Sequence, residues 1–133
     1  MTLIDTHVLL WLGEENPRLG RRTRRRIDTA LHAEELAISA LSFWEIGMLL
    51  AKGRIALSQP VEAYRRDALG SGIEEIPVNG AIGILASQLD GLHGDPADRI
   101  IAATAIRASG ELITADTHLL HWRGALRSRD ATR

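Results

Sequence analysis

The chain has 133 residues, of which 45% are hydrophobic and 25% charged, so we expect one globular domain spanning residues 1–133. The net charge of −1 excludes nucleic-acid binding through bulk charge and leaves only a local basic patch for that role. The absence of cysteine excludes disulfides, thiolate metal sites and cysteine nucleophiles.

Short apolar runs alternate along the chain with segments of helical periodicity. In chain order, the predicted elements are a strand at 2–4, helices at 7–12 and 18–31, a strand at 35–39, helices at 42–51 and 60–69, a strand at 73–78, helices at 81–89 and 98–109, a strand at 111–114, a helix at 117–122 and a last strand at 126–128. Lys52-Gly53 is typical of a helix C-terminus. Pro77 indicates an edge or end position for its strand. We expect residues 129–133 to form a frayed tail.

Strands that alternate with helices predict right-handed crossovers and a mostly parallel sheet between helical layers, which is an α/β fold. No apolar stretch approaches the roughly 20 residues that span a bilayer. No signal peptide is visible, because Asp5 and His7 interrupt the apolar start. We therefore expect a soluble, cytoplasmic protein with no membrane partner.

Four acidic residues stand where a predicted strand gives way to a helix or where a helix begins: Asp5, Glu45, Asp98 and Asp116. In a parallel sheet the C-terminal ends of the strands lie at one edge, and ligands bind there. Carboxylates gathered at that edge repel one another unless positive charge arrives, and only Asp98 has a basic neighbour in sequence, Arg99. Oxygen-only ligands suit a hard cation, so the pattern favours an Mg²⁺ or Mn²⁺ site.

Helix capping explains each of these carboxylates better than metal binding does when the residue is taken alone. Ser42 and Glu45 match a capping box with Ser42 as the N-cap. Asp95 fits the N-cap of the helix that contains Asp98, and Asp5 and Asp116 each fit the N-cap of the helix that follows. Capping is the favoured interpretation for any single residue, but it does not require several carboxylates at one edge.

Four segments resemble the acidic motifs of the PIN-domain family, in the family's order: IDTHVLLW at 4–11, ISALSFWEI at 38–46, HGDPADRIIAATA at 93–105 and TAD at 114–116. Together they extend over nearly the whole chain. Within the family, the chain length and the DTHVLLW and HGDPADR segments are similar to VapC-type toxins of bacterial toxin–antitoxin pairs.

The resemblance implies an α/β/α sandwich, Mg²⁺- or Mn²⁺-dependent RNA cleavage, inhibition by a small cognate antitoxin, and a homodimer or a hetero-oligomer with that antitoxin. It carries the acidic roles onto Asp5, Glu45, Asp98 and Asp116. We expect Asp5 and Asp98 to be direct ligands, and Asp95 to be a second-tier candidate. Ala97 stands where the family usually has a large apolar residue, which we interpret as a packing difference. The expected reaction is hydrolysis of an RNA phosphodiester by metal-activated water.

Arginines gather between Arg18 and Arg26, and three roles stay open for them: holding RNA phosphates, contacting an antitoxin, or forming a solvated helix face. Trp11 and Trp44 lie in apolar runs. We expect them in the core or on a dimer or antitoxin surface, rather than as platforms for stacked bases. His93 is interpreted as a loop residue and not as a metal ligand.

Thr6 and Thr114 adjoin the acidic residues, and we favour ordinary strand-end hydroxyls over groups that orient a carboxylate. An enzyme with an aspartate nucleophile typically needs a second aspartate two positions after the first, where His7 stands. A receiver-like domain needs a late lysine, whereas the only lysine is Lys52. Neither GxGxxG nor a GK[ST] loop occurs. The remaining alternative is a non-catalytic PIN-like module that binds RNA or a partner.

Overall fold

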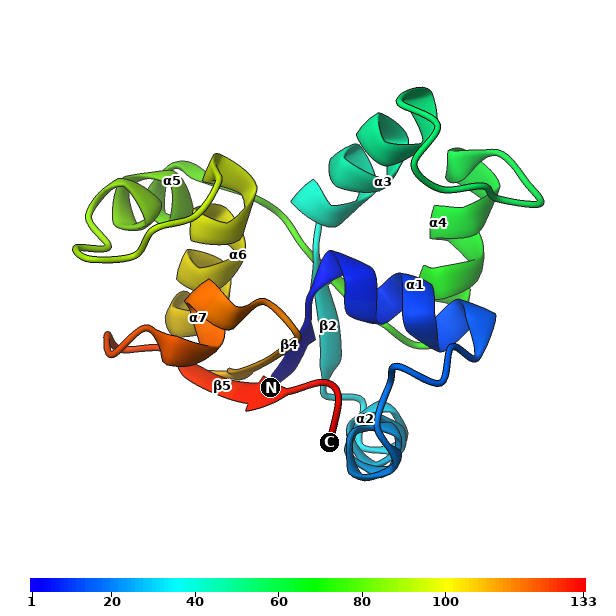
Figure 1. Cartoon of the computed structure of the whole chain (residues 1–133), viewed down its shortest axis with the longest axis horizontal. Coiled ribbons are helices and arrows are strands. Elements are labelled where there is room, and N and C mark those ends of the chain that lie inside the picture. Colours follow the sequence, from blue (N-terminus) through cyan, green and yellow to red (C-terminus); the bar gives the residue numbers. More distant parts are fainter.

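The computed structural model describes residues 1–133 as one five-stranded sheet between two layers of helices (Figure 1). The strands are β1 (Thr2–Ile4), β2 (Leu36–Ser39), β3 (Glu74–Ile76), β4 (Glu111–Thr114) and β5 (Arg127–Asp130). The helices are α1 (Thr6–Glu14), α2 (Arg21–His32), α3 (Leu41–Ala51), α4 (Val61–Gly70), α5 (Gly80–Ser87), α6 (Pro96–Arg107) and α7 (Thr117–His121). The strand order is β3-β2-β1-β4-β5 with every pairing parallel, which confirms the predicted α/β class.

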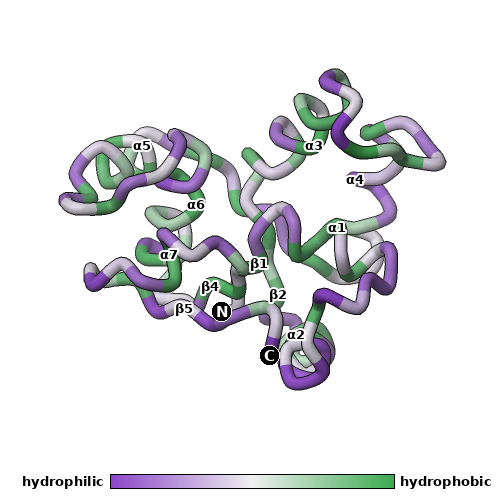
Figure 2. Tube along the Cα trace, viewed as in Figure 1, coloured by the Kyte–Doolittle hydropathy of each residue, from purple (hydrophilic) through white to green (hydrophobic).

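Each face of the sheet packs against its own layer of helices, because successive side chains of a strand point to opposite faces. Leu3 and Leu112 pack with α5, α6 and α7, which lie on the left in Figure 1. Ile4, Ile38 and Ile113 pack with α1 to α4 on the right. In Figure 2 the hydrophobic colour follows the central strands, and the hydrophilic colour gathers on α2 and on the connecting loops. The structure is thus a three-layer α/β/α sandwich, as expected.

Every predicted element is present, and the largest disagreement at an end is at α2. The prediction began this helix at Arg18, but the helix begins at Arg21 with Gly20 as its N-cap. The side chain of Asn16 accepts the amide of Arg18 at 3.0 Å, and the carbonyl of Asn16 accepts the amide of Leu19 at 3.1 Å. These bonds form a turn that delays the helix. None of the helices combines the length and apolarity needed to cross a membrane.

The expected frayed tail at residues 129–133 is wrong. Strand β5 runs two residues further than predicted, and Ala131 is completely buried. The amide of Gly20 donates to the carbonyl of Ala131 at 2.8 Å, and the amide of Thr23 donates to the carbonyl of Arg133 at 3.1 Å. The last residues therefore close over the start of α2.

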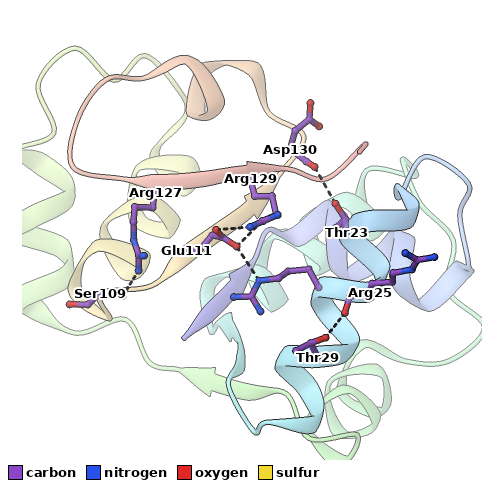
Figure 3. A network of polar contacts seen from close by, with 9 residues as sticks. Thr23, Arg25, Thr29, Ser109, Glu111, Arg127, Arg129 and Asp130 are labelled. Carbon is purple, nitrogen blue, oxygen red and sulfur yellow. Dashed lines mark hydrogen bonds and ion pairs between the residues drawn. The ribbon is translucent and has the colours of Figure 1, made fainter.

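The arginines between Arg18 and Arg26 do not act as one cluster. Arg24 donates to backbone carbonyls of the turn before α2, at 2.6 Å to Asn16. Arg26 forms an ion pair with Glu111. Glu111 also binds Arg129 of β5 (Figure 3). These contacts fasten α2 to the turn before it and to strand β4 of the sheet. The arginines of α2 that remain exposed with no ion pair are Arg21, Arg22 and Arg25.

Gly20→Ala should destabilise the protein by about 1–3 kcal/mol, the usual cost of forcing extra atoms into a packed site. A Cβ at this position would overlap the backbone of Arg133, which does not move as a side chain can. Gly47→Ala in α3 is the matched control, because its Cβ meets no atom within 4 Å. The control should stabilise the protein by about 0.5–1 kcal/mol, since Ala is the better helix former. Urea unfolding measures both, and equal effects would contradict this packing.

Candidate active site

An open pocket of about 290 Å³ lies where β1 and β4 end. Its lining residues come from both helical layers and are Asp5, His7, Trp11, Glu45, Asp95, Asp98, Ala115 and Asp116. The structure therefore brings together all four carboxylates that the sequence placed at one edge of the sheet, and Asp95 joins them.

Asp5 is the most firmly held of these carboxylates. Its Oδ1 accepts the amide of Thr6 at 2.8 Å, and its Oδ2 accepts the hydroxyl of Thr114 at 2.6 Å. The amide of Asp116 donates to the same threonine oxygen at 3.0 Å. Burial raises the pKa of Asp5, and the hydrogen bonds from Thr114 and Thr6 oppose that rise. Thr114 thus orients a carboxylate, and its interpretation as an ordinary strand-end hydroxyl is wrong.

Glu45 is free of the capping role that the sequence suggested. Helix α3 begins at Leu41, whose amide donates to the Ser39 hydroxyl at 3.1 Å, so Ser42 lies inside the helix and not at its N-cap. Thr6 Oγ1 lies 2.6 Å from Glu45 Oε1 and 2.8 Å from Ser42 Oγ. Because an ionised carboxylate only accepts, Thr6 donates to Glu45 and receives from Ser42. Thr6 therefore orients Glu45, which also corrects the strand-end interpretation of Thr6.

Asp95 is the N-cap of α6, as predicted, and its Oδ1 accepts the amide of Asp98 at 2.9 Å. Asp116 is likewise the N-cap of α7, where its Oδ1 accepts the amides of His118 and Leu119 at 2.8 and 3.1 Å. In both residues a single oxygen makes the capping bonds. The other oxygen of each residue is free to take part in the pocket. Asp95 and Asp116 can therefore cap a helix and line the pocket at the same time, and the two interpretations do not exclude each other.

Asp98 is the pocket carboxylate on which the most neighbouring negative charges act. Its pKa is raised to about 7, first by burial and then by the negative charges of Asp95, Asp116, Asp5 and Glu45. Arg99, the one basic neighbour of Asp98 in sequence, does not pair with it and so does not offset this rise in pKa. Arg99 donates to the backbone carbonyls of Ala86 at 2.9 Å and Leu92 at 2.7 Å, on the α5 side of the helix.

The chemistry of the lining fits a hard cation. Burial also raises the pKa of Glu45, and His7 is the only basic side chain that lines the pocket. No three acidic or histidine side chains converge into a ready-made metal site. Mg²⁺ does not need one, because it usually keeps several waters and binds one or two carboxylates directly. The lack of a preformed three-ligand cluster is therefore compatible with a hydrated cation in this pocket.

His7 and Trp11 line the pocket, and the sequence analysis assigned neither to it. They are four residues apart in α1 and so share one face of that helix. This four-residue spacing directly after Asp5 is the sequence feature that could have placed both residues at the pocket. The guanidinium of Arg18 lies 5.9 Å from the centre of the Trp11 ring. His93 is an exposed loop residue outside the pocket, as predicted.

A second pocket of about 260 Å³ adjoins the carboxylates and shares Glu45 and Asp95 with them. It lies between α3 and the start of α6. Trp44 forms part of its wall and is 58% exposed, which excludes the core and leaves the dimer or antitoxin surface among the expected positions of this tryptophan.

Comparisons with known proteins agree with this architecture. The family described as PIN domain matches residues 2–124. The chain is 35% identical over 118 residues to "Ribonuclease VapC22" of Mycobacterium tuberculosis, which covers 88% of each chain. The fold of the present chain is similar to that of a chain in VapBC2 from Rickettsia felis bound to promoter DNA, with a TM-score of 0.72, 16% identity and 96% of each chain covered. It is also similar to a chain in a toxin–antitoxin complex from Klebsiella pneumoniae, with a TM-score of 0.63, 26% identity and 95% of each chain covered. The chain belongs to the PIN domain family.

Proposed function

We propose that this protein is a metal-dependent endoribonuclease that hydrolyses RNA phosphodiester bonds, acting as the toxin of a toxin–antitoxin pair. The observation that carries the proposal is the gathering of Asp5, Glu45, Asp98 and Asp116 in one open pocket whose only basic lining residue is His7. The relative named as a ribonuclease supports RNA as the substrate. The similar toxin–antitoxin structures support a cognate antitoxin as the partner.

In this proposal the four carboxylates divide into metal ligands and a proton acceptor. Asp5 and Asp98 would hold Mg²⁺ or Mn²⁺ directly, and Asp116 would complete the site with the oxygen that does not cap α7. The cation, when bound, would lower the pKa of water and offset the charge that develops on the phosphate. Glu45, oriented by the Thr6 hydroxyl, is placed to accept the proton of the attacking water.

The test is cleavage of single-stranded RNA by the purified chain with Mg²⁺, with Mn²⁺ and with EDTA. We expect cleavage with either metal and none with EDTA. Asp116→Asn should lose activity, whereas Asp90→Asn, an equal change of charge at an exposed loop residue outside the pocket, should not. Cleavage that survives EDTA would contradict the metal requirement. RNA binding without cleavage in either metal would favour the non-catalytic module instead.

A further inference from the structure

The pocket beside the carboxylates, called here the α3 groove, is built from one face of α3 and the first residues of α6. Trp44, Met48 and Lys52 follow one another at intervals of four residues, so they form a continuous stripe along α3. Pro96 and Ala97 form the facing wall. The groove opens at its acidic end onto the proposed catalytic pocket, because Glu45 lines both.

The apolar part of the groove is exposed to an unusual degree. Trp44 is 58% and Met48 38% exposed, although both are large hydrophobic side chains. Trp44 makes no hydrogen bond and stacks on no cation within the chain, in contrast to Trp11 beneath Arg18 and Trp122, whose Nε1 donates to Asp90. A free indole face is the surface on which nucleobases stack, and this stacking tolerates any base.

The far end of the groove is basic. Helix α3 ends in a Schellman motif, in which the amide of Gly53 donates to Leu50 at 3.1 Å and the amide of Arg54 donates to Leu49 at 2.9 Å. Gly53 has a φ of 68°, which the motif requires at this position. The motif fixes the backbone that carries Lys52 and Arg54. Neither cation pairs with a carboxylate.

We propose that the α3 groove is a nucleotide subsite for single-stranded RNA, next to the bond that is cut. A base stacks on Trp44, and the phosphates beyond it lie against Lys52 and Arg54. The inference rests on the proposed ribonuclease function and names how that site holds its substrate. It also reverses the sequence-based expectation that Trp44 is not a platform for bases.

Charge is the reason to place RNA in this groove and not a protein segment. Lys52 and Arg54 are exposed and pair with no carboxylate of the chain, so they are free to bind phosphates, which an apolar protein segment does not carry. An RNA strand whose phosphate enters the carboxylate pocket must continue over the rim of that pocket. The α3 groove lies at that rim. Along it, the exposed indole of Trp44 comes first and the unpaired cations Lys52 and Arg54 follow, so a base and then its phosphates can bind in that order.

The first experiment measures binding of a fluorescein-labelled, mixed-sequence single-stranded RNA of about 12 nucleotides, within the usual size range of such sites, in EDTA. We expect Trp44→Ala to raise the Kd about tenfold, and Trp44→Phe to stay within about threefold of the wild type, because Phe still stacks. Lys52→Ala and Arg54→Ala should each reduce the slope of log K against log salt by about 0.7.

Arg107→Ala is the matched control for charge. Arg107 is exposed in the last turn of α6, at the opposite end of that helix from Asp98, and it has no ion pair. The Arg107→Ala variant should keep the Kd for RNA and the salt slope near their wild-type values. A blunt RNA duplex is the second control, because its bases are paired and Trp44→Ala should not change its binding. Unchanged thermal unfolding of each variant establishes that it is folded.

Steady-state cleavage of the same RNA separates the two proposals. We expect Trp44→Ala to raise KM about tenfold and to change kcat little, because Trp44 lies outside the carboxylate pocket. If the wild type cleaves RNA and the Trp44, Lys52 and Arg54 variants keep its KM, Kd and salt slope, the subsite is wrong and the function stands. If the wild type cleaves nothing but Trp44→Ala still weakens RNA binding, the subsite stands and the function is wrong. Variants that lose only affinity for a protein partner would overturn the RNA assignment.

Discussion

Asp98→Asn should reduce RNA cleavage by more than about 100-fold and, in the same protein, raise the melting temperature measured in EDTA. The loss of activity follows from its proposed role as a direct ligand, since even groups that only orient metal ligands are worth about 10–100-fold. The gain in stability follows from the pKa of Asp98, which stands at about 7 because burial and four neighbouring carboxylates disfavour its charge.

The sign of the stability effect follows from proton linkage. The folded protein binds the Asp98 proton more tightly than the unfolded chain does. The stability from this proton is therefore complete below the unfolded pKa of 3.8 and is lost as pH rises through about 7. Asparagine is neutral and removes this loss at pH 8. Because solvent reaches the half-buried side chain, we expect a gain of only about 1 kcal/mol, which corresponds to about 3–6 °C.

Thermal unfolding in EDTA at pH 8, followed by circular dichroism, measures the gain, and an RNA cleavage assay with Mg²⁺ measures the loss. Asp90→Asn is again the control and should change neither quantity. Cleavage at the normal rate by Asp98→Asn would exclude Asp98 as a metal ligand. A lower melting temperature would mean that its carboxylate stabilises the fold, contrary to the pKa argument.

Mg²⁺ or Mn²⁺ should raise the melting temperature of the wild-type protein, and the gain should grow from pH 6 to pH 8. A cation at 100 times its Kd stabilises the folded state by about 2.7 kcal/mol, or about 10 °C for a chain of this size. The cation needs ionised carboxylates, whereas burial and repulsion raise the pKa of Asp5, Glu45 and Asp98. Since Asp98 is mostly protonated at pH 6, the apparent affinity there should be about tenfold weaker than at pH 8.

Melting curves over a series of metal concentrations at pH 6, 7 and 8 measure this dependence, with KCl at matched ionic strength as the control for screening. Asp98→Asn supplies the matched variant and should gain little from the metal at any pH. A gain that is equal at all three pH values, or equal in the two proteins, would show that the cation binds elsewhere.

Much of this site follows from local rules of sequence. Asp5 and Asp116 each follow an apolar strand, and parallel strands end at a shared edge, so their meeting was predictable without coordinates. Asp95 was recognisable as an N-cap because Pro96 occupies the first position of α6. These inferences need only a strand, a turn residue and the rule that crossovers are right-handed.

Other features depend on which atoms meet across the fold. Glu45 escapes a capping role because of Ser39. The Ser39 hydroxyl accepts the amide of Leu41, so α3 begins before Ser42 and Ser42 is not its N-cap. Strand β5 has the sequence Arg-Ser-Arg-Asp and no apolar alternation, so its length was underestimated. As an edge strand, it is held by β4 and by the Arg129–Glu111 ion pair and not by burial of its own side chains.

The hydrogen bond between Thr114 and Asp5 joins residues 109 positions apart in the chain. A ribosome adds about 5–20 residues each second, so several seconds separate the synthesis of these two residues. During that interval β1 has no β4 beside it, and neither Asp98 nor Asp116 has reached the pocket until most of the chain has been made. The four carboxylates of the pocket therefore cannot assemble until residue 116 has been synthesised, so the complete site forms only near the end of translation.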